Sequence, residues 1–173
     1  MADGTFAALL FLLSFSDMHA NYCETDLGCF ARSEVVPRVY FSVGEVQERH
    51  AKAGSEIYLR YDLGHKNGPL GHAIGLSLSG RGETWFGAGQ SYIAGVEDYG
   101  LKIEFHAMTG LYDKGSGHDL GGRLAFRSGV DLIYEKTGGL RYAVSYDHRS
   151  NMGIYKENPG IETIQFAVSF PLY

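Results

Sequence analysis

The last stretch of the chain, Ile161–Tyr173, reads IETIQFAVSFPLY and places apolar residues at every second position. These apolar positions are Ile164, Phe166, Val168, Phe170 and Leu172. A period of two residues predicts a β-strand with one apolar face. The run exceeds the roughly 5–6 residues of a globular strand and reaches the roughly 9–11 residues of a tilted strand that crosses a membrane. A terminal aromatic residue such as Tyr173 also suits an outer-membrane barrel.

Seven further segments upstream alternate in the same way, and turns rich in Gly, Asn, Asp or Pro separate them. They are Glu34–Val46, Ser55–Gly64, Leu70–Ser79, Glu83–Gly95, Tyr99–Tyr112, Asp119–Lys136 and Gly139–Ser150. The length of 173 residues suits one domain, and 24 Gly, 12 Tyr and 10 Phe make a β-rich composition. We therefore predict an all-β fold, an eight-stranded antiparallel transmembrane β-barrel of the bacterial outer membrane.

Charged residues occupy the positions between the apolar ones, which favours lipid outside the barrel and a polar network inside it. They include Glu104, His106, Arg123, Arg127, Arg141 and Asp147. Short turns at 80–82 and 136–139 contrast with longer connections at 113–122 and 151–160, the pattern of short turns at one end and long loops at the other. Periodicity does not say which face is inside, so a soluble β-barrel that binds an apolar ligand stays an alternative.

The N-terminal segment, residues 1–30, differs from the predicted barrel of residues 31–173. Thr5–Ala20 has the length and apolar character of a signal-peptide core, which favours a secretory origin. However, Asp3 precedes it without any Lys or Arg, unlike the basic start of a signal peptide. The apolar run is also too short to span a bilayer as a helix. The segment is thus either a cleaved signal or a retained extension.

The two cysteines, Cys23 and Cys29, are too few for a zinc site, which needs four ligands. They form either a small disulfide loop or two free thiols. The histidines outside the C-terminal stretch show no metal-ligand spacing, so we predict neither a metal nor a cofactor. The formal net charge of −5 argues against nucleic acid as a partner.

Three polar residues near the last turn suggest a catalytic site. His148 and Ser150 continue the apolar face of their strand, and Glu162 continues that of the last strand. A hairpin centred on Tyr155 would set His148 directly opposite Glu162. A serine hydroxyl needs an imidazole to take its proton, and the imidazole needs a carboxylate to fix its tautomer. The alternative is a polar hairpin rim at the level of the lipid headgroups.

The sequence His148-Arg-Ser-Asn-Met-Gly153, followed by Asn158-Pro-Gly-Ile-Glu162, resembles the C-terminal signature of the lipid A 3-O-deacylase (PagL) family. The resemblance implies an eight-stranded outer-membrane barrel with Ser150 as nucleophile, His148 as base and Glu162 as acid on the lipid-facing wall. It also implies that Asn151 and Gly153 form the oxyanion hole, and it leaves the role of Asn158 open. The N-terminal segment matches nothing in the family pattern.

The resemblance implies a serine esterase that removes the 3-O-linked hydroxyacyl chain of lipid A, with lipopolysaccharide as substrate. We expect the site to face the outer leaflet, because an even number of strands leaves the start of the first strand and the end of the last strand both on the periplasmic side. A non-catalytic barrel, serving as a structural or assembly partner in the outer membrane, is the alternative of another class. A homodimer or a membrane-complex partner is also compatible with the sequence.

Overall fold

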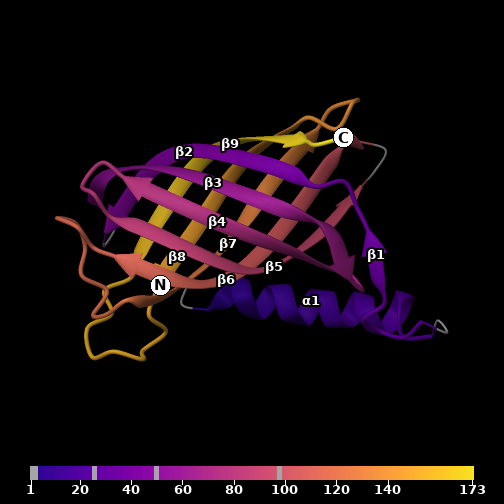
Figure 1. Cartoon of the computed structure of the whole chain (residues 1–173), viewed down its shortest axis with the longest axis horizontal. Coiled ribbons are helices and arrows are strands. Elements are labelled where there is room, and N and C mark those ends of the chain that lie inside the picture. Colours follow the sequence, from indigo (N-terminus) through magenta and orange to yellow (C-terminus); the bar gives the residue numbers. More distant parts are fainter. Residues whose placement is uncertain (1–3, 25–26, 49–50, 97–98) are drawn as a thin grey trace.

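Eight long strands close into an antiparallel barrel in the computed structural model, which describes residues 4–24, 27–48, 51–96 and 99–173 (Figure 1). The strands are β2 (Arg38–Glu48), β3 (Ala51–Asn67), β4 (Leu70–Ser79), β5 (Thr84–Val96), β6 (Leu101–Asp113), β7 (Leu124–Glu135), β8 (Arg141–Ser150) and β9 (Ile161–Pro171). Each pairs with the next, and β2 closes the barrel by pairing with β9. The predicted eight-stranded barrel is confirmed. A short strand that the sequence did not predict, β1 (Arg32–Glu34), pairs with the end of β3.

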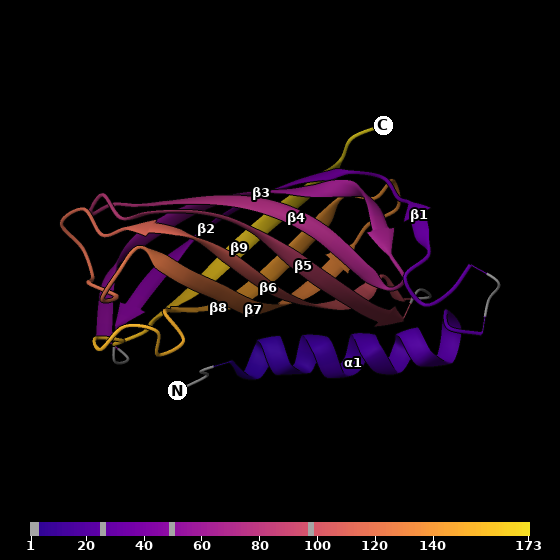
Figure 2. The same ribbon diagram turned by 60° about the horizontal axis from the view of Figure 1, so that its bottom comes forward.

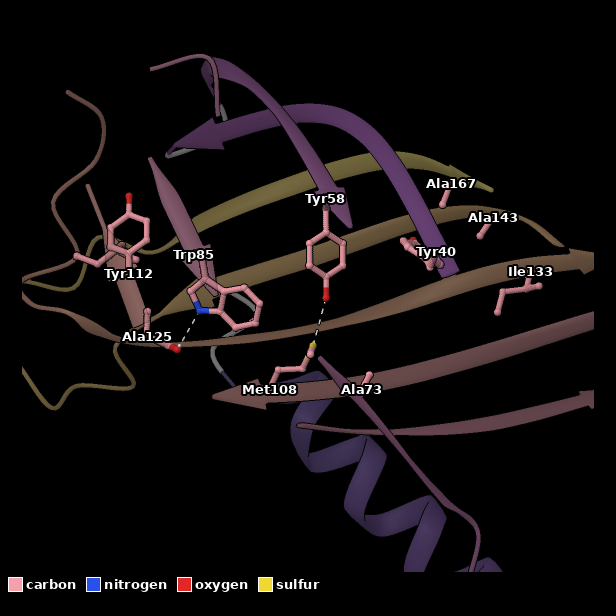
Figure 3. Close-up of a cluster of buried hydrophobic side chains, with 11 residues drawn as sticks. Tyr40, Tyr58, Ala73, Trp85, Met108, Tyr112, Ala125, Ile133, Ala143 and Ala167 are labelled. Atoms are coloured by element: carbon pink, nitrogen blue, oxygen red, sulfur yellow. Dashed lines mark hydrogen bonds between the residues drawn. The ribbon is translucent and has the colours of Figure 1, made fainter. Parts of the chain in front are cut away.

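The apolar face of the barrel points outward, as the alternation predicts for a membrane protein. Exposed side chains on this face include Phe41, Val43, Ile57, Leu59, Ile74, Leu76, Leu132, Val144, Ile164 and Phe166. Their positions contradict the soluble alternative, because a soluble barrel would turn its apolar face inward. The side chains of Tyr58 and Trp85 point into the barrel, where Trp85 Nε1 donates to the Ala125 carbonyl at 3.2 Å (Figure 3).

Ion pairs fill the remainder of the interior. Arg127 lies between Glu56, at 2.8 Å, and Asp147, at 2.5 Å. Arg60 similarly contacts Glu104 at 2.9 Å and Asp131 at 3.5 Å. Such buried charges persist only when they are paired, so the network matches the predicted polar interior.

One of the predicted interior charges does not belong to this network. Arg123 was predicted to point inward, but it lies in the connection before β7 with its side chain 85% exposed. Arg141, the first residue of β8, lies on the inward face as predicted, where it lines a small interior cavity with Arg60 and Glu104 and contacts Glu135. Alternation alone misplaced Arg123 because the strand begins one residue after it.

The connections β2–β3, β4–β5, β6–β7 and β8–β9 lie at one end of the barrel, since successive strands run in opposite directions. Both long connections, 114–123 and 151–160, are therefore at this end. The short turn at 80–82 lies there too, so the prediction that short turns and long loops occupy opposite ends was wrong for this turn. We call this end the loop end.

Helix α1 (Thr5–Asn21) lies along the outside of the barrel against β5, β6 and β7 (Figures 1 and 2). Leu10, Ser14 and Met18, each four residues apart, form its buried face and point at the barrel wall. After the helix, a disulfide joins Cys23 to Cys29, so the structure contains the bridged form of the two alternatives. Among the described residues, no helix has both the length and the apolar character needed to cross a membrane.

Candidate active site

His148 and Glu162 lie directly opposite each other on β8 and β9. The predicted pairing of these residues is confirmed, and His148 Nδ1 is 3.4 Å from Glu162 Oε1. This pairing follows from the register of the hairpin. Arg149 pairs with Ile161 next to the connection between the two strands, which sets His148 opposite Glu162. A carboxylate beside Nδ1 favours the tautomer with its proton on that nitrogen, which leaves Nε2 as the proton acceptor.

Ser150 follows two residues after His148 and therefore shares its outward face. Both side chains line one cavity of about 390 Å³ on the outside of the barrel. They are nevertheless only 4% and 3% exposed, respectively. The sequence predicted that these side chains would face lipid directly. Instead, the first turns of α1 and Met152 line the other side of the same cavity and separate them from lipid.

A second serine lies beside His148. Ser128 of β7 is the cross-strand neighbour of His148 on the side opposite to Glu162, and it lines the same cavity. This neighbour is not evident from the sequence, because the contact joins residues that are twenty positions apart. The two serines differ in backbone surroundings. Ser128 lies inside a strand, whereas Ser150 is the last residue of β8.

Asn151 fastens the chain after Ser150. Its side chain is fully buried and donates hydrogen bonds of 2.6 Å to the carbonyls of Leu120 and Glu157. It thus ties the β6–β7 connection to the β8–β9 connection. Its backbone N–H donates to Asn158 Oδ1 at 3.0 Å, which gives Asn158 a structural position that the sequence left open.

The two groups predicted to form an oxyanion hole are engaged within the loop. The N–H of Asn151 donates to Asn158, and the N–H of Gly153 donates to Asn151 Oδ1 at 2.7 Å. Between them, Met152 has a φ of 53°, a left-handed conformation that is strained for a residue with a side chain. The strained turn reverses the chain directly after Ser150, and the Met152 N–H donates to Ser150 Oγ at 3.4 Å.

Gly160 makes room for the imidazole. A β-carbon at this position would lie 2.9 Å from His148 Cε1, and the φ of 67° is also one that favours glycine. This requirement for glycine is not evident from the sequence, because it depends on a contact between two segments of the folded chain. No group of His, Cys, Asp or Glu side chains in the described ranges is arranged to hold a metal ion.

The closed barrel, its apolar outer wall and its charged interior define an outer-membrane β-barrel. The crystal structure of the outer membrane enzyme PagL is similar, with a TM-score of 0.59 and 19% identity over 78% of this chain and 99% of that one. A de novo designed transmembrane β-barrel is also similar, with a TM-score of 0.60 and 11% identity over 81% of this chain and 98% of the design. At such identities these likenesses show the fold alone. No curated protein sequence matches the chain.

The model of one protein family, described as lipid A 3-O-deacylase (PagL), matches residues 44–171. The chain belongs to this family, whose enzymes are hydrolases that act on ester bonds. All the residues of the candidate site on β8, β9 and their connection fall within the matched range, whereas α1 falls outside it.

Proposed function

We propose that this protein removes the 3-O-linked hydroxyacyl chain of lipid A, with Ser150 as nucleophile, His148 as base and Glu162 as acid. The observation that carries the proposal is the placement of His148 opposite Glu162, with Ser150 on the same face and beside the same cavity. Membership of the lipid A 3-O-deacylase family supports the reaction class.

In this mechanism, His148 Nε2 takes the proton of Ser150 as Oγ attacks the carbonyl carbon of the ester. The tetrahedral intermediate collapses when the sugar oxygen leaves with the proton returned by His148. A water molecule, activated by the same imidazole, then hydrolyses the acyl-serine and releases the fatty acid. Glu162 acts throughout on the Nδ1 side, where it orients the ring and stabilises the imidazolium.

Asn151 and Gly153 are the proposed donors to the oxyanion. Each N–H has to exchange its present acceptor in the loop for the developing negative charge. The strained turn at Met152 supports this role, because a reversal after the nucleophile directs successive N–H groups toward the same region.

Ser150 is a better nucleophile candidate than Ser128 because of its backbone surroundings. Ser128 lies within paired strands, where the neighbouring N–H groups belong to the β-ladder and do not serve an oxyanion. Ser150 ends its strand, and the N–H groups that follow it belong to a loop.

Mass spectrometry of lipid A after incubation with purified protein tests the proposal. Wild type should release one hydroxyacyl chain from the 3 position, and Ser150→Ala should release none. Ser128→Ala should still deacylate, and Ser145→Ala, on the same strand but facing the interior, should match wild type. Loss of activity in Ser128→Ala together with full activity in Ser150→Ala would show that Ser128, and not Ser150, is the nucleophile.

We further propose that the loop end faces the outer leaflet, where lipopolysaccharide resides. We also propose a homodimer or another membrane partner, which cross-linking in native membranes tests. Recovery of the uncross-linked monomer alone would contradict it.

A further inference from the structure

Helix α1 is an addition to the family region that reaches the candidate site. It lies outside residues 44–171, yet the ring of Phe6 packs edge-to-face on Tyr146, two residues before His148, with 5.7 Å between centroids. Figures 1 and 2 both place the start of the helix near the loop end of the barrel. The N-terminal turns of α1 therefore lie where a substrate of Ser150 would have to bind.

The C-terminal half of the helix is anchored to the barrel. Met18 packs with Leu70, and the chain that follows the helix accepts hydrogen bonds from the β3–β4 turn. There, the Gly68 N–H donates to the Ala31 carbonyl at 2.9 Å. A disulfide joins Cys23 to Cys29 in this part of the chain. Helix α1 is thus anchored at its C-terminal end, and its first turns lie against the barrel wall.

The cavity of about 390 Å³ lies between these first turns and the barrel. Gly4, Ala7 and Phe11, one face of two helical turns, form its outer side. Over this span the helix advances roughly 10 Å. The barrel side consists largely of small or apolar residues from β5, β6 and β7, such as Ala88, Ala107 and Phe126.

We propose that α1 forms the outer wall of a pocket for the fatty acyl chain, and that Ala7 and Phe11 set the chain length the enzyme accepts. This inference rests on the proposed function, because the acyl chain has to extend from a carbonyl at Ser150. The lining supports an alkyl chain as occupant: the charged side chain of Arg127, which contributes to the wall, is turned inward to Glu56 and Asp147. Without α1 the same strands would present an open groove to lipid.

A matched pair of substitutions tests the pocket. Ala7 lines the cavity, whereas Ala8 is exposed on the other face of the helix. Ala7→Trp should lower the deacylation rate for hexadecanoyl and tetradecanoyl substrates by about tenfold or more relative to decanoyl, since a difference of one methylene in an apolar pocket is worth at least about tenfold. Ala8→Trp, with the same increase in bulk, should keep the wild-type profile.

The reverse change should widen the pocket. Phe11→Ala should raise the relative rate for the longest chains, and Phe15→Ala, a neighbouring ring that does not line the cavity, should leave the profile unchanged. An equal fall in rate at every chain length in Ala7→Trp would indicate a general obstruction and overturn the selectivity. The same profile in Ala7→Trp and Ala8→Trp would also overturn it.

Two measurements separate this inference from the proposed function. The intact mass of the protein purified from outer membranes must include α1, and a mass that lacks residues 1–21 overturns the inference. A photoreactive analogue of dodecanoic acid should cross-link to α1 and β7 in Ser150→Ala, and Ala7→Trp should lower this labelling at least about fivefold, whereas Ala8→Trp should not. Labelling of α1 without any deacylation by wild type would support the acyl-chain pocket and refute the proposed function. Deacylation without labelling of α1 would support the proposed function and refute the pocket.

Discussion

The side chain of Asn158 accepts the backbone N–H of Asn151 at 3.0 Å and so holds the residue that directly follows Ser150. We expect Asn158→Ala to lower the deacylation rate about fivefold, because loss of one hydrogen bond of about 1 kcal/mol frees the turn that positions the serine. Asn158→Asp keeps the acceptor oxygen and should retain most of the activity. A faster Asn158→Ala enzyme would contradict this expectation and mean that release of the Asn151 N–H for the oxyanion outweighs the loss of the anchored turn.

Removing Glu162 should be less severe than removing Ser150. Glu162→Ala leaves the imidazole in place but without its partner on Nδ1, and loss of the acid costs roughly 10⁴-fold in comparable triads. Lipid A deacylation in timed reactions measures the difference. Equal and complete loss in Glu162→Ala and Ser150→Ala would argue that Glu162 does more than orient the histidine.

Glu56 should contribute strongly to barrel stability. It contacts Arg127 and Arg149, and accepts a hydrogen bond from Gln165 at 3.0 Å, in the buried interior. Glu56→Gln leaves two arginines without a full counter-charge, which should cost about 3–5 kcal/mol. The temperature at which the folded band is replaced by the unfolded band in detergent electrophoresis measures this loss of stability. Glu45→Gln, which removes an exposed pair with Lys52, should shift that temperature little.

The contacts of Glu83 with Ser79 and His118 at the loop end should stabilise the protein less in acid. Burial raises the pKa of Glu83, but hydrogen bonds from Ser79 and His118 outweigh it, and the net shift of the pKa is downward. A carboxyl with a lowered folded pKa adds stability above its unfolded pKa of about 4.3 and loses that contribution as the pH falls through the folded value. Wild type should therefore exceed Glu83→Gln in stability by about 1 kcal/mol at neutral pH, and the two should converge as the pH falls below the lowered folded pKa of Glu83. Unfolding curves at neutral pH and through the acid range measure the difference; a difference that stays constant with pH would contradict the linkage.

Two exposed lysines at opposite ends of the barrel can establish its orientation. Lys156 lies in the β8–β9 connection at the loop end, and Lys136 lies in the β7–β8 connection at the other end. A membrane-impermeant amine reagent added to intact cells should modify Lys156 and spare Lys136. The reverse pattern would place the candidate site on the periplasmic side.

The fold was predictable from sequence because a period of two residues extends through long segments. In a membrane barrel the outer face of each strand is apolar and the inner face is polar, so the two kinds of residue alternate clearly. The same pattern gave the pairing of His148 with Glu162, since a hairpin register follows from one turn. Contacts that join distant strands were not predictable: Ser128 beside His148, and Gly160 beneath its ring, depend on packing in three dimensions.

The position of α1 on the barrel was also not predictable from the sequence. An apolar run such as Thr5–Ala20 has no charged stripe to indicate which face it buries or what it packs against. Its coverage of Ser150 and His148 appears only when the helix lies on the wall, and it changes the expected surroundings of the site from lipid to protein.

The ion pairs inside the barrel have a consequence for transport. Arg60, Arg127 and their carboxylate partners occupy the lumen, so we expect the protein to conduct no ionic current across a bilayer. If Ser150 is the nucleophile, as we propose, the lumen offers its substrate no route. The substrate would then arrive by lateral diffusion among its neighbouring lipids, and a released fatty acid would depart the same way, so the fluidity of the leaflet would become a determinant of turnover.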